Sequence, residues 1–336
     1  MYRVFLLSVA TLLGAAIVAI VPLPGRAQEQ YQFETELMAK RHLFRDVGAG
    51  FRSIRRGPNG NYYILTADAP VLRIYNAVGK LVGQMPSESA AKAKGASLVS
   101  GESFDVDRQG RVAVCDRGAG AVKIYSPDGS LTTTIPVASP ISAVFLPGDQ
   151  LAVSSPNIDH LVTLYELMGV SVRSYGDTEE ISDRPEVNSQ ANWGHLAADE
   201  MGNTYFAFDY LPEPTMRKFD RAGNLAMEIS LKTLEFQPAA QAARKAMARV
   251  DRNPIELHRI ISAIGVDVRT QDVWVAIGTL LMHFDKDGLR LASFRTSTTR
   301  DERIEPATIL VEPDRLLIGA DPLGIYEFPK PERLPQ

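Results

Sequence analysis

The chain lacks most of the features by which small exported proteins and nucleic-acid-binding proteins are recognised. Only one of its 336 residues is a cysteine, Cys115, so no internal disulfide can form and the fold depends on its core. The net charge of -4 includes no basic excess, which excludes the electrostatic footprint of a nucleic-acid-binding protein. No GxSxG, GxxxxGK[ST], GxGxxG or CxxC motif is present. What the chain has is 45% apolar residues, enough for a large core that would bury Cys115 as a small hydrophobe.

The one long apolar run stands at the N-terminus. Residues 4–21 are uncharged and follow Arg3, and a stretch with proline and glycine leads to Ala27. This pattern is typical of a secretory signal peptide, residues 1–27, cleaved after Ala27. A run of about eighteen apolar residues is near the lower limit for a membrane span, so an uncleaved anchor is the alternative. We expect residues 28–336 to form a single domain with no stable membrane insertion after cleavage. Since it lacks disulfides, we expect it in a bacterial periplasm or secreted by bacterial-type export.

A unit of four strands and two glycine turns recurs along the rest of the chain. Its clearest copy is FDVDRQGRVAVCDRGAGAVKIYSPDGSL, residues 104–131. The segment FRSIRRGPNGNYYILTADAPVLRIYNAVGKL, residues 51–81, has the same order, and the two turn glycines are separated by 19 residues in both copies. Self-similarity at a period of about 40 to 50 residues is the signature of propellers and solenoids.

The second strand of each unit is an unbroken apolar run. A half-exposed strand alternates polar and apolar residues, so continuous runs predict strands that are buried on both faces. Blades stacked around an axis provide such burial. The six runs are YYIL (62–65), VAV (112–114), LAV (151–153), TYFAF (204–208), VWVAI (273–277) and LLIG (316–319).

The sequence therefore predicts an all-β fold, a six-bladed β-propeller with four-stranded antiparallel blades. The last unit ends after GIYEFPKP without residues for an outer strand, and the stretch before the first unit has no unit of its own. We expect residues of about 31–42 to complete the last blade, which closes the ring and removes exposed edges. The Ala-, Arg- and Lys-rich segment 237–250 predicts one short helical insert between blades 4 and 5.

These units resemble NHL repeats, and the whole resembles the six-bladed propellers of the NHL-repeat and TolB-like superfamily. The resemblance covers nearly the entire mature chain and is strongest in the second unit. Members of that superfamily include protein-binding scaffolds, lactonases, amidating lyases and strictosidine-synthase-like proteins. The fold that the resemblance implies therefore does not indicate which reaction, if any, the protein catalyses.

Three connections between a fourth strand and the next first strand are long, at residues 86–102, 175–193 and roughly 233–258. We expect all three on one face, where repeat proteins gather their functional insertions. The alternative is that they are only solvated loops. This face is the expected location of a protein partner or a small polar ligand.

The residues that enter the first strands should line the central channel. The predicted ligand-binding residues among them are Arg52, Glu102, Ser103, Trp193, His195 and Glu305. Trp193 is the foremost candidate because it ends a polar loop and does not follow the repeat. Ser53, Ser262 and Thr308 enter the channel at corresponding positions. A channel of this kind binds a small polar ligand or is simply filled with water and side chains.

Metal ligands are sparse. Of the five histidines only His195 stands at the start of a first strand, and no close His, Cys or Asp spacing accompanies it. We therefore expect no metal, no cofactor and no catalytic residue. The aspartates Asp105, Asp107, Asp116, Asp199 and Asp267 are interpreted as structural groups at turns and strand ends. The hypothesis is a non-catalytic binding propeller; the alternative is a metal-dependent lactonase or lyase-type propeller with a divalent cation in the channel, where Glu102 would be the first carboxylate ligand.

Overall fold

Each of the six repeat units forms one antiparallel sheet. The structure is a computed structural model that describes residues 35–332 apart from 48, 157–158, 232–236 and 249–256, so the expected signal peptide lies outside the described residues. All described residues belong to one unit, residues 33–336. Blade 1 consists of β3 (Phe51–Arg56), β4 (Tyr62–Thr66), β5 (Leu72–Tyr75) and β6 (Leu81–Met85). Blade 2 consists of β7 (Gly101–Val106), β8 (Val112–Asp116), β9 (Ala121–Tyr125) and β10 (Leu131–Pro136). Blade 3 consists of β11 (Ser142–Leu146), β12 (Gln150–Ser154), β13 (His160–Glu166) and β14 (Ser171–Asp177).

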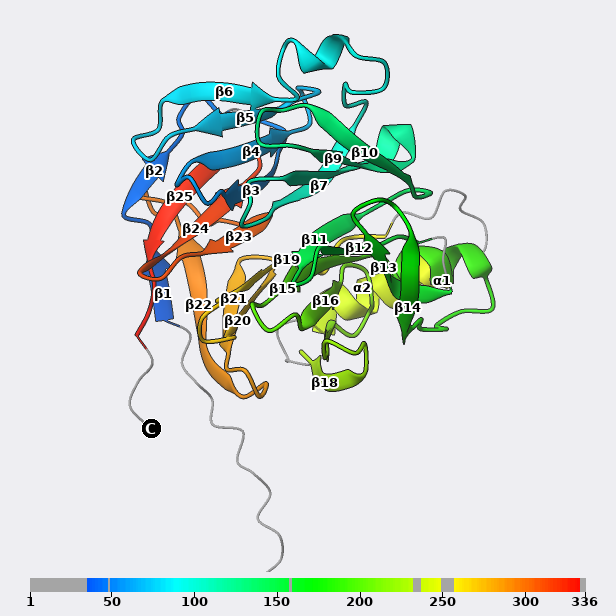
Figure 1. Ribbon diagram of the computed structural model, residues 1–336. Helices are drawn as coiled ribbons and strands as arrows, with labels where there is room; N and C mark the ends of the chain where they lie inside the picture. Colours follow the sequence, from blue (N-terminus) through cyan, green and yellow to red (C-terminus); the bar gives the residue numbers. More distant parts are fainter. Residues whose placement is uncertain (1–34, 48, 157–158, 232–236, 249–256, 333–336) are drawn as a thin grey trace, which may run out of the picture. The chain divides into compact units, whose positions relative to one another are not determined.

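Blades 4 to 6 follow the same order. Blade 4 consists of β15 (Gly194–Ala198), β16 (Thr204–Phe208), β17 (Thr215–Phe219) and β18 (Leu225–Ser230). Blade 5 contains β19 (Ile261–Val266), β20 (Val273–Ile277), β21 (Leu280–Phe284) and β22 (Arg290–Ser297). Blade 6 contains β23 (Thr308–Val311), β24 (Arg315–Ala320) and β25 (Gly324–Pro329). The first strands β3, β7, β11, β15, β19 and β23 each contact the next, and β23 contacts β3, so the ring is closed (Figure 1). The chain is a six-bladed β-propeller.

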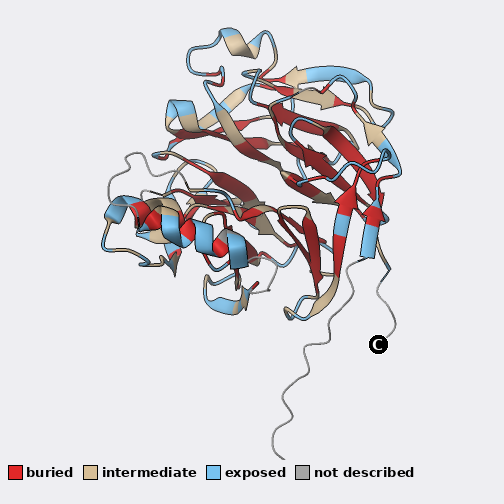
Figure 2. Ribbon diagram, turned by 180° about the vertical axis from the view of Figure 1, so that it is seen from behind, coloured by how far each residue is buried: buried red, intermediate tan, exposed pale blue. Residues whose placement is uncertain are grey.

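The blades are held together by the apolar faces of their second strands. β4, β8, β16 and β20 are buried at every residue, as the continuous apolar runs predict, and the buried residues lie within and between the sheets (Figure 2). The core is divided into clusters that join neighbouring blades. In one of them Tyr62 and Ile64 of blade 1 pack with Leu317 and Ile325 of blade 6. Dispersion and apolar burial between blades therefore take the place of disulfides.

The N-terminal segment closes the ring, but with different residues from those expected. β2 (Arg41–Leu43) pairs antiparallel with β25 and becomes the outer strand of blade 6. The earlier part of the predicted 31–42 segment, β1 (Thr35–Met38), pairs parallel with β22, so blade 5 has five strands instead of four. The difference arises because an exposed outer strand offers unpaired backbone groups to whichever segment passes it.

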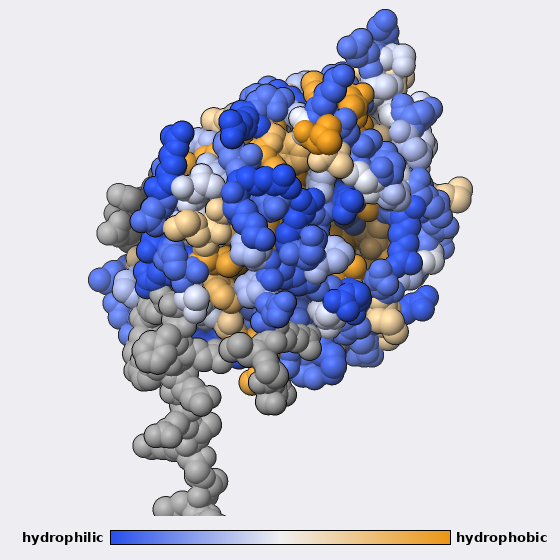
Figure 3. Space-filling view, turned by 90° about the vertical axis from the view of Figure 1, so that its left-hand side faces the viewer, coloured by the Kyte–Doolittle hydropathy of each residue, from blue (hydrophilic) through white to orange (hydrophobic). Residues whose placement is uncertain are grey.

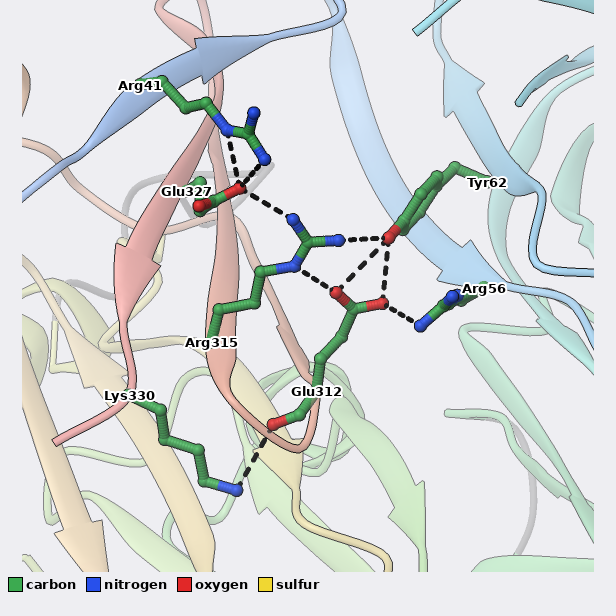
Figure 4. A network of polar contacts seen from close by, with 7 residues as sticks. All are labelled: Arg41, Arg56, Tyr62, Glu312, Arg315, Glu327 and Lys330. Carbon is green, nitrogen blue, oxygen red and sulfur yellow. Dashed lines mark hydrogen bonds and ion pairs between the residues drawn. The ribbon is translucent and has the colours of Figure 1, made fainter. Parts of the chain in front are cut away.

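A network of ion pairs around the buried carboxylate of Glu312 reinforces this closure (Figure 4). The carboxylate of Glu312, which is 4% exposed, accepts hydrogen bonds from Arg56 at 3.0 Å and from Nε of Arg315 at 2.5 Å. Nη1 of Arg315 donates to Glu327 at 2.7 Å, and Glu327 also pairs with Arg41 of β2 at 2.7 Å. The network therefore connects blade 1, blade 6 and the closing strand.

The helices lie in the connections between blades. α2 (Gln237–Met247) stands between β18 and β19, which confirms the predicted insert between blades 4 and 5. α1 (Pro185–Ala191), in the connection between blades 3 and 4, was not predicted because the polar sequence there lacks apolar periodicity. It begins at a proline, which suits the first helical turn, and its Val187 and Ala191 are buried.

The side of the molecule that carries β2 and β25 is mostly hydrophilic, with small apolar patches between the polar side chains (Figure 3). No helix within the described residues is long and apolar enough to span a membrane.

Candidate functional site

The two ends of the ring differ in character. Successive strands of each blade run in opposite directions, so the connections between blades and the loops between second and third strands all lie at one end, here called the loop face. The turns between first and second strands lie at the other end, the turn face. Three contacts support this arrangement on the loop face: the Asp209 amide donates to the Trp193 carbonyl at 2.9 Å, the Ile260 amide donates to the Asp209 carbonyl at 2.6 Å, and Arg117 lies over Trp193.

Arg52 and Glu102 enter the channel mouth from equivalent positions of neighbouring blades. In β3 the register shifts between Phe51 and Ser53, and in β7 it shifts between Gly101 and Ser103, so each of the two charged residues is the extra residue of a β-bulge. A bulge turns a side chain away from the regular alternation of the strand. The two side chains meet, with Nη1 of Arg52 at 3.1 Å and 3.2 Å from the two carboxylate oxygens of Glu102.

A second charged group lies between blades 4 and 5. Nδ1 of His195, in β15, is 2.9 Å from Oδ1 of Asp209, which follows β16. The other oxygen of Asp209 lies 3.3 Å from Nε of Arg259, just before β19. Asp209 is 1% exposed, so this carboxylate is buried behind the two groups that it contacts.

The two charged groups act on one another across the mouth. Burial opposes the charge of Arg259, but Asp209, then Tyr210, then Glu102 act against it, and together they raise the pKa of Arg259. Glu102 belongs to blade 2, whereas Arg259 precedes the first strand of blade 5, on the opposite side of the ring. We therefore treat Arg52, Glu102, Trp193, His195, Asp209 and Arg259 as one set, the mouth cluster.

Trp193 supplies the aromatic member of the mouth cluster. The guanidinium carbon of Arg117 lies 4.3 Å from the centre of the Trp193 ring, a cation–π contact, and the ring of Tyr210 meets it edge-on at 5.9 Å. Burial raises the pKa of Tyr210, so its hydroxyl stays protonated at neutral pH. Nε1 of Trp193 is buried and has no hydrogen-bond partner among the described residues. A buried indole N–H without a partner is unusual.

Four of the six ligand-binding residues predicted from the sequence lie at the loop face: Arg52 contacts Glu102, and His195 and Trp193 each contact Asp209. The other two lie elsewhere. Ser103 is 5% exposed and lies opposite Cys115 of β8, between strands. Glu305 is exposed in the connection before β23 and makes no hydrogen bond or ion pair with a described residue. Whether any of the six binds a ligand stays a prediction.

Sequence reasoning missed Asp209, Tyr210, Arg259 and Arg117. Asp209 had a signal, because an acid directly follows the buried second strand in two blades, at Asp116 and at Asp209. Asp116 is used differently: it accepts hydrogen bonds from the amides of Val99 and Ser100 and pairs with a lysine. Arg259 had no signal of its own, since only the ring places it opposite Glu102.

The turn-face aspartates are structural, as predicted. In Asp107, Asp199 and Asp267 one carboxylate oxygen accepts the amide two residues later, at 2.9 Å in each case. This is the Asx-turn, in which the side chain stabilises the turn. Asp105 is different because it points into the channel toward Arg55, 3.4 Å away. Within the described part of the chain, no group of three or more His, Cys, Asp or Glu residues is placed to hold a metal ion.

No protein-family model matches the chain, and no curated protein matches it. Solved structures do match in fold. A streptogramin B lyase aligns with a TM-score of 0.55 at 11% identity, over 84% of this chain and 94% of that one. A catalytically inactive virginiamycin B lyase from Staphylococcus aureus with quinupristin aligns with a TM-score of 0.53 at 13% identity, over 86% and 87%.

Hydrazine synthase from Kuenenia stuttgartiensis aligns with a TM-score of 0.54 at 11% identity, over 91% of this chain and 99% of that one. At such identities the likeness concerns the fold alone. The fold hosts lyases and other proteins, so function has to be argued from the site.

Proposed function

We propose that this protein is an exported, non-catalytic propeller that binds a small polar ligand with an anionic group at the loop face. The observation that supports this proposal is the arrangement of charged groups in the mouth cluster. The exposed fractions are 37% for the Arg52 side chain, 35% for Arg259 and 23% for His195. The carboxylates of Glu102 and Asp209 are 12% and 1% exposed. The accessible guanidinium groups of Arg52 and Arg259 are therefore hydrogen-bond donors that buried carboxylates hold in place.

Guanidinium groups held in this way suit a planar oxyanion. Arginine presents several N–H donors in a rigid fork, which matches a carboxylate or a phosphate. The orientation is set before the ligand arrives, so little side-chain freedom remains to be lost on binding. Trp193, whose carbonyl accepts the Asp209 amide, would supply an aromatic contact for the remainder of the ligand.

The ligand hypothesis is tested by calorimetric titration of the purified protein with acetate, benzoate, citrate and inorganic phosphate. We expect at least one of these anions to bind, and Arg52→Gln and Arg259→Gln each to weaken it about tenfold or more, because a hydrogen bond to a charged group contributes about 1.5–3 kcal/mol. Lys286→Gln, at an exposed lysine of the turn face, is the matched control and should change nothing. Failure of all four anions to bind would disprove the proposal.

Two other outcomes point to other functions. Tight stoichiometric binding of calcium or zinc that is lost in Glu102→Ala or His195→Ala would favour the lactonase or lyase-type alternative. Capture of a protein partner that depends on Trp193, without anion binding, would favour a scaffold.

Export is proposed from the N-terminal sequence, and membership of the NHL-repeat and TolB-like superfamily from the repeats. Mass spectrometry of the protein from the periplasm or medium should find a chain that begins at Gln28. Full-length chain retained in the membrane fraction would instead indicate an anchor.

A further inference from the structure

The half of the central channel that opens at the turn face contains a cavity of about 460 Å³. All six first strands contribute to its wall, which makes it part of the channel itself. Small residues on β15, Ala197 and Ala198, leave the space open. Gly265 on β19 instead permits close packing, because an added Cβ there would meet Ile309 at 2.8 Å. Pockets for small molecules have volumes of roughly 300–1,000 Å³, so the cavity is of the size that a ligand uses.

Apolar residues of the first strands form the inner wall of this cavity, whereas its rim at the turn face is polar and is lined by Asp107, Arg108, Gln109, Arg111, Asp149, Asp199 and Glu200. Val144 and Phe145 come from β11, Ile264 and Val266 from β19, and Leu310 from β23. Water against such a wall is unfavourable, and an apolar molecule that displaces it is stabilised by the hydrophobic effect. The mouth cluster differs, because its members are charged or aromatic.

Among the first-strand residues that line the cavity, one pair is charged. Nε of Arg55, in β3, lies 3.4 Å from Oδ1 of Asp105, in β7, and the two side chains are 23% and 19% exposed. This distance is longer than a charge-assisted hydrogen bond of about 2.7–2.9 Å, so neither group fully satisfies the other. Oδ2 of Asp105 accepts the Phe145 amide at 2.9 Å, and Nη1 of Arg55 donates to the Ile54 carbonyl at 2.9 Å. Among the described residues, the guanidinium of Arg55 donates no other hydrogen bond.

We propose that this cavity is a second binding site, separate from the mouth cluster, for a small amphipathic molecule with an apolar body and an uncharged head that both donates and accepts hydrogen bonds, such as an amide. Arg55 and Asp105 balance each other in charge. An anionic head would face Asp105 and a cationic head would face Arg55, each in an apolar surrounding where an unbalanced charge is costly. An amide head donates to Asp105 and accepts from Arg55.

The surroundings of Asp105 agree with this choice. Burial raises the pKa of Asp105, and Arg55 acts in the opposite direction. The carboxyl is therefore already short of stabilising partners in the free protein. At the opening, Arg108 and Glu200 form an ion pair of 2.9 Å between exposed side chains, 78% and 54% accessible, which surface residues exchange easily for water. That pair does not block access.

The test uses three probes that share one apolar body, octanamide, octanoate and octylamine, titrated calorimetrically against the mature protein. We expect octanamide to bind about tenfold more tightly than the two charged probes. The reason is that its head group can form hydrogen bonds to both Arg55 and Asp105, whereas each charged head would be left with an unpaired charge. Equal binding of all three, or no binding of octanamide, would overturn the proposal.

Three variants locate the binding. Ala197→Phe fills the cavity and should weaken octanamide about tenfold or more; unchanged affinity would mean that the probe binds elsewhere. The double variant Arg55→Met with Asp105→Leu keeps the wall apolar and leaves no single buried charge, so it should fold and lose the preference for the amide head. If the folded double variant still preferred octanamide over the charged probes, Arg55 and Asp105 would not be the groups that recognise the amide head. Trp193→Ala should leave octanamide affinity unchanged, so this site and the loop-face site succeed or fail separately.

Discussion

The hydroxyl of Tyr62, in the first blade, donates a hydrogen bond of 3.0 Å to the carboxylate of Glu312, in the last blade. The same hydroxyl accepts a hydrogen bond of 2.6 Å from Nη2 of Arg315. The two residues are 250 positions apart in the sequence, so the contact exists only when the ring has closed. Burial, followed by the charge of Glu312, raises the pKa of Tyr62, which keeps the phenol a donor at neutral pH.

Removing that hydroxyl should weaken ring closure. We expect Tyr62→Phe to lower the free energy of unfolding by about 1–3 kcal/mol, because a buried carboxylate and a guanidinium each lose a partner. Urea denaturation followed by tryptophan fluorescence measures the change. Tyr165→Phe is the control, since Tyr165 makes no hydrogen bond through its hydroxyl to a described residue, and its effect should stay within about 0.5 kcal/mol. Equal effects of the two substitutions would contradict the role of the network.

A glycine of blade 6 permits the close packing of blade 1. An added Cβ at Gly319 would lie 1.9 Å from the ring of Phe51, which is 4% exposed and has no room to move. We expect Gly319→Ala to lower the free energy of unfolding by about 1–3 kcal/mol, as for other overpacked cores. Gly83→Ala is the matched control, because its nearest neighbour is 3.9 Å away. It should be neutral or slightly stabilising, and a loss as large as that of Gly319→Ala would show that the clash is not the cause.

The buried pair of Asp116 and Lys123 should make stability depend on acid pH. Burial opposes the charge of Asp116, but Lys123 at 2.7 Å and two backbone amides outweigh it, so the pKa of Asp116 is lowered from its usual 3.8. The unfolded chain then binds a proton more readily than the folded one. The stabilisation is complete above the unfolded pKa and is lost as the pH falls through the folded pKa.

We therefore expect the stability difference between the wild type and Asp116→Asn to be full at neutral pH and to shrink below about pH 4. Urea midpoints measured from neutral to acid pH give this difference. Asp287→Asn, at an exposed carboxylate, controls for the loss of one acid. A stability difference that grows toward acid pH would contradict a lowered pKa of Asp116 in the folded protein.

The single thiol should be inert in the folded protein. Burial raises the pKa of Cys115 to about 12, and its side chain is inaccessible within blade 2. Since the thiolate is the reactive form, we expect no labelling by iodoacetamide at pH 8 without denaturant and complete labelling in urea, measured by mass. Rapid labelling of the native protein would mean that blade 2 opens readily.

The mouth cluster was only partly predictable. Arg52 and Glu102 were recognisable because both stand at the start of the first strand of a clear repeat, but the bulges that turn them toward each other have no sequence signature. Arg259 and Asp209 lie 50 residues apart and meet through a connection that no local pattern specifies. The turn-face cavity was not foreseen, because it forms only where all six first strands come together around the channel.

By itself the sequence determined the number of blades and the identity of the buried strands, because continuous apolar runs and glycine turns are local properties that repeat at a fixed spacing. Only the tertiary structure decided that residues 35–38 add a fifth strand to blade 5, that Arg259 pairs with Asp209, and that Arg55 and Asp105 share a cavity wall. These relations join residues far apart in the chain. Their energies come from burial and from the distances between charges, and both are set only when the ring is closed.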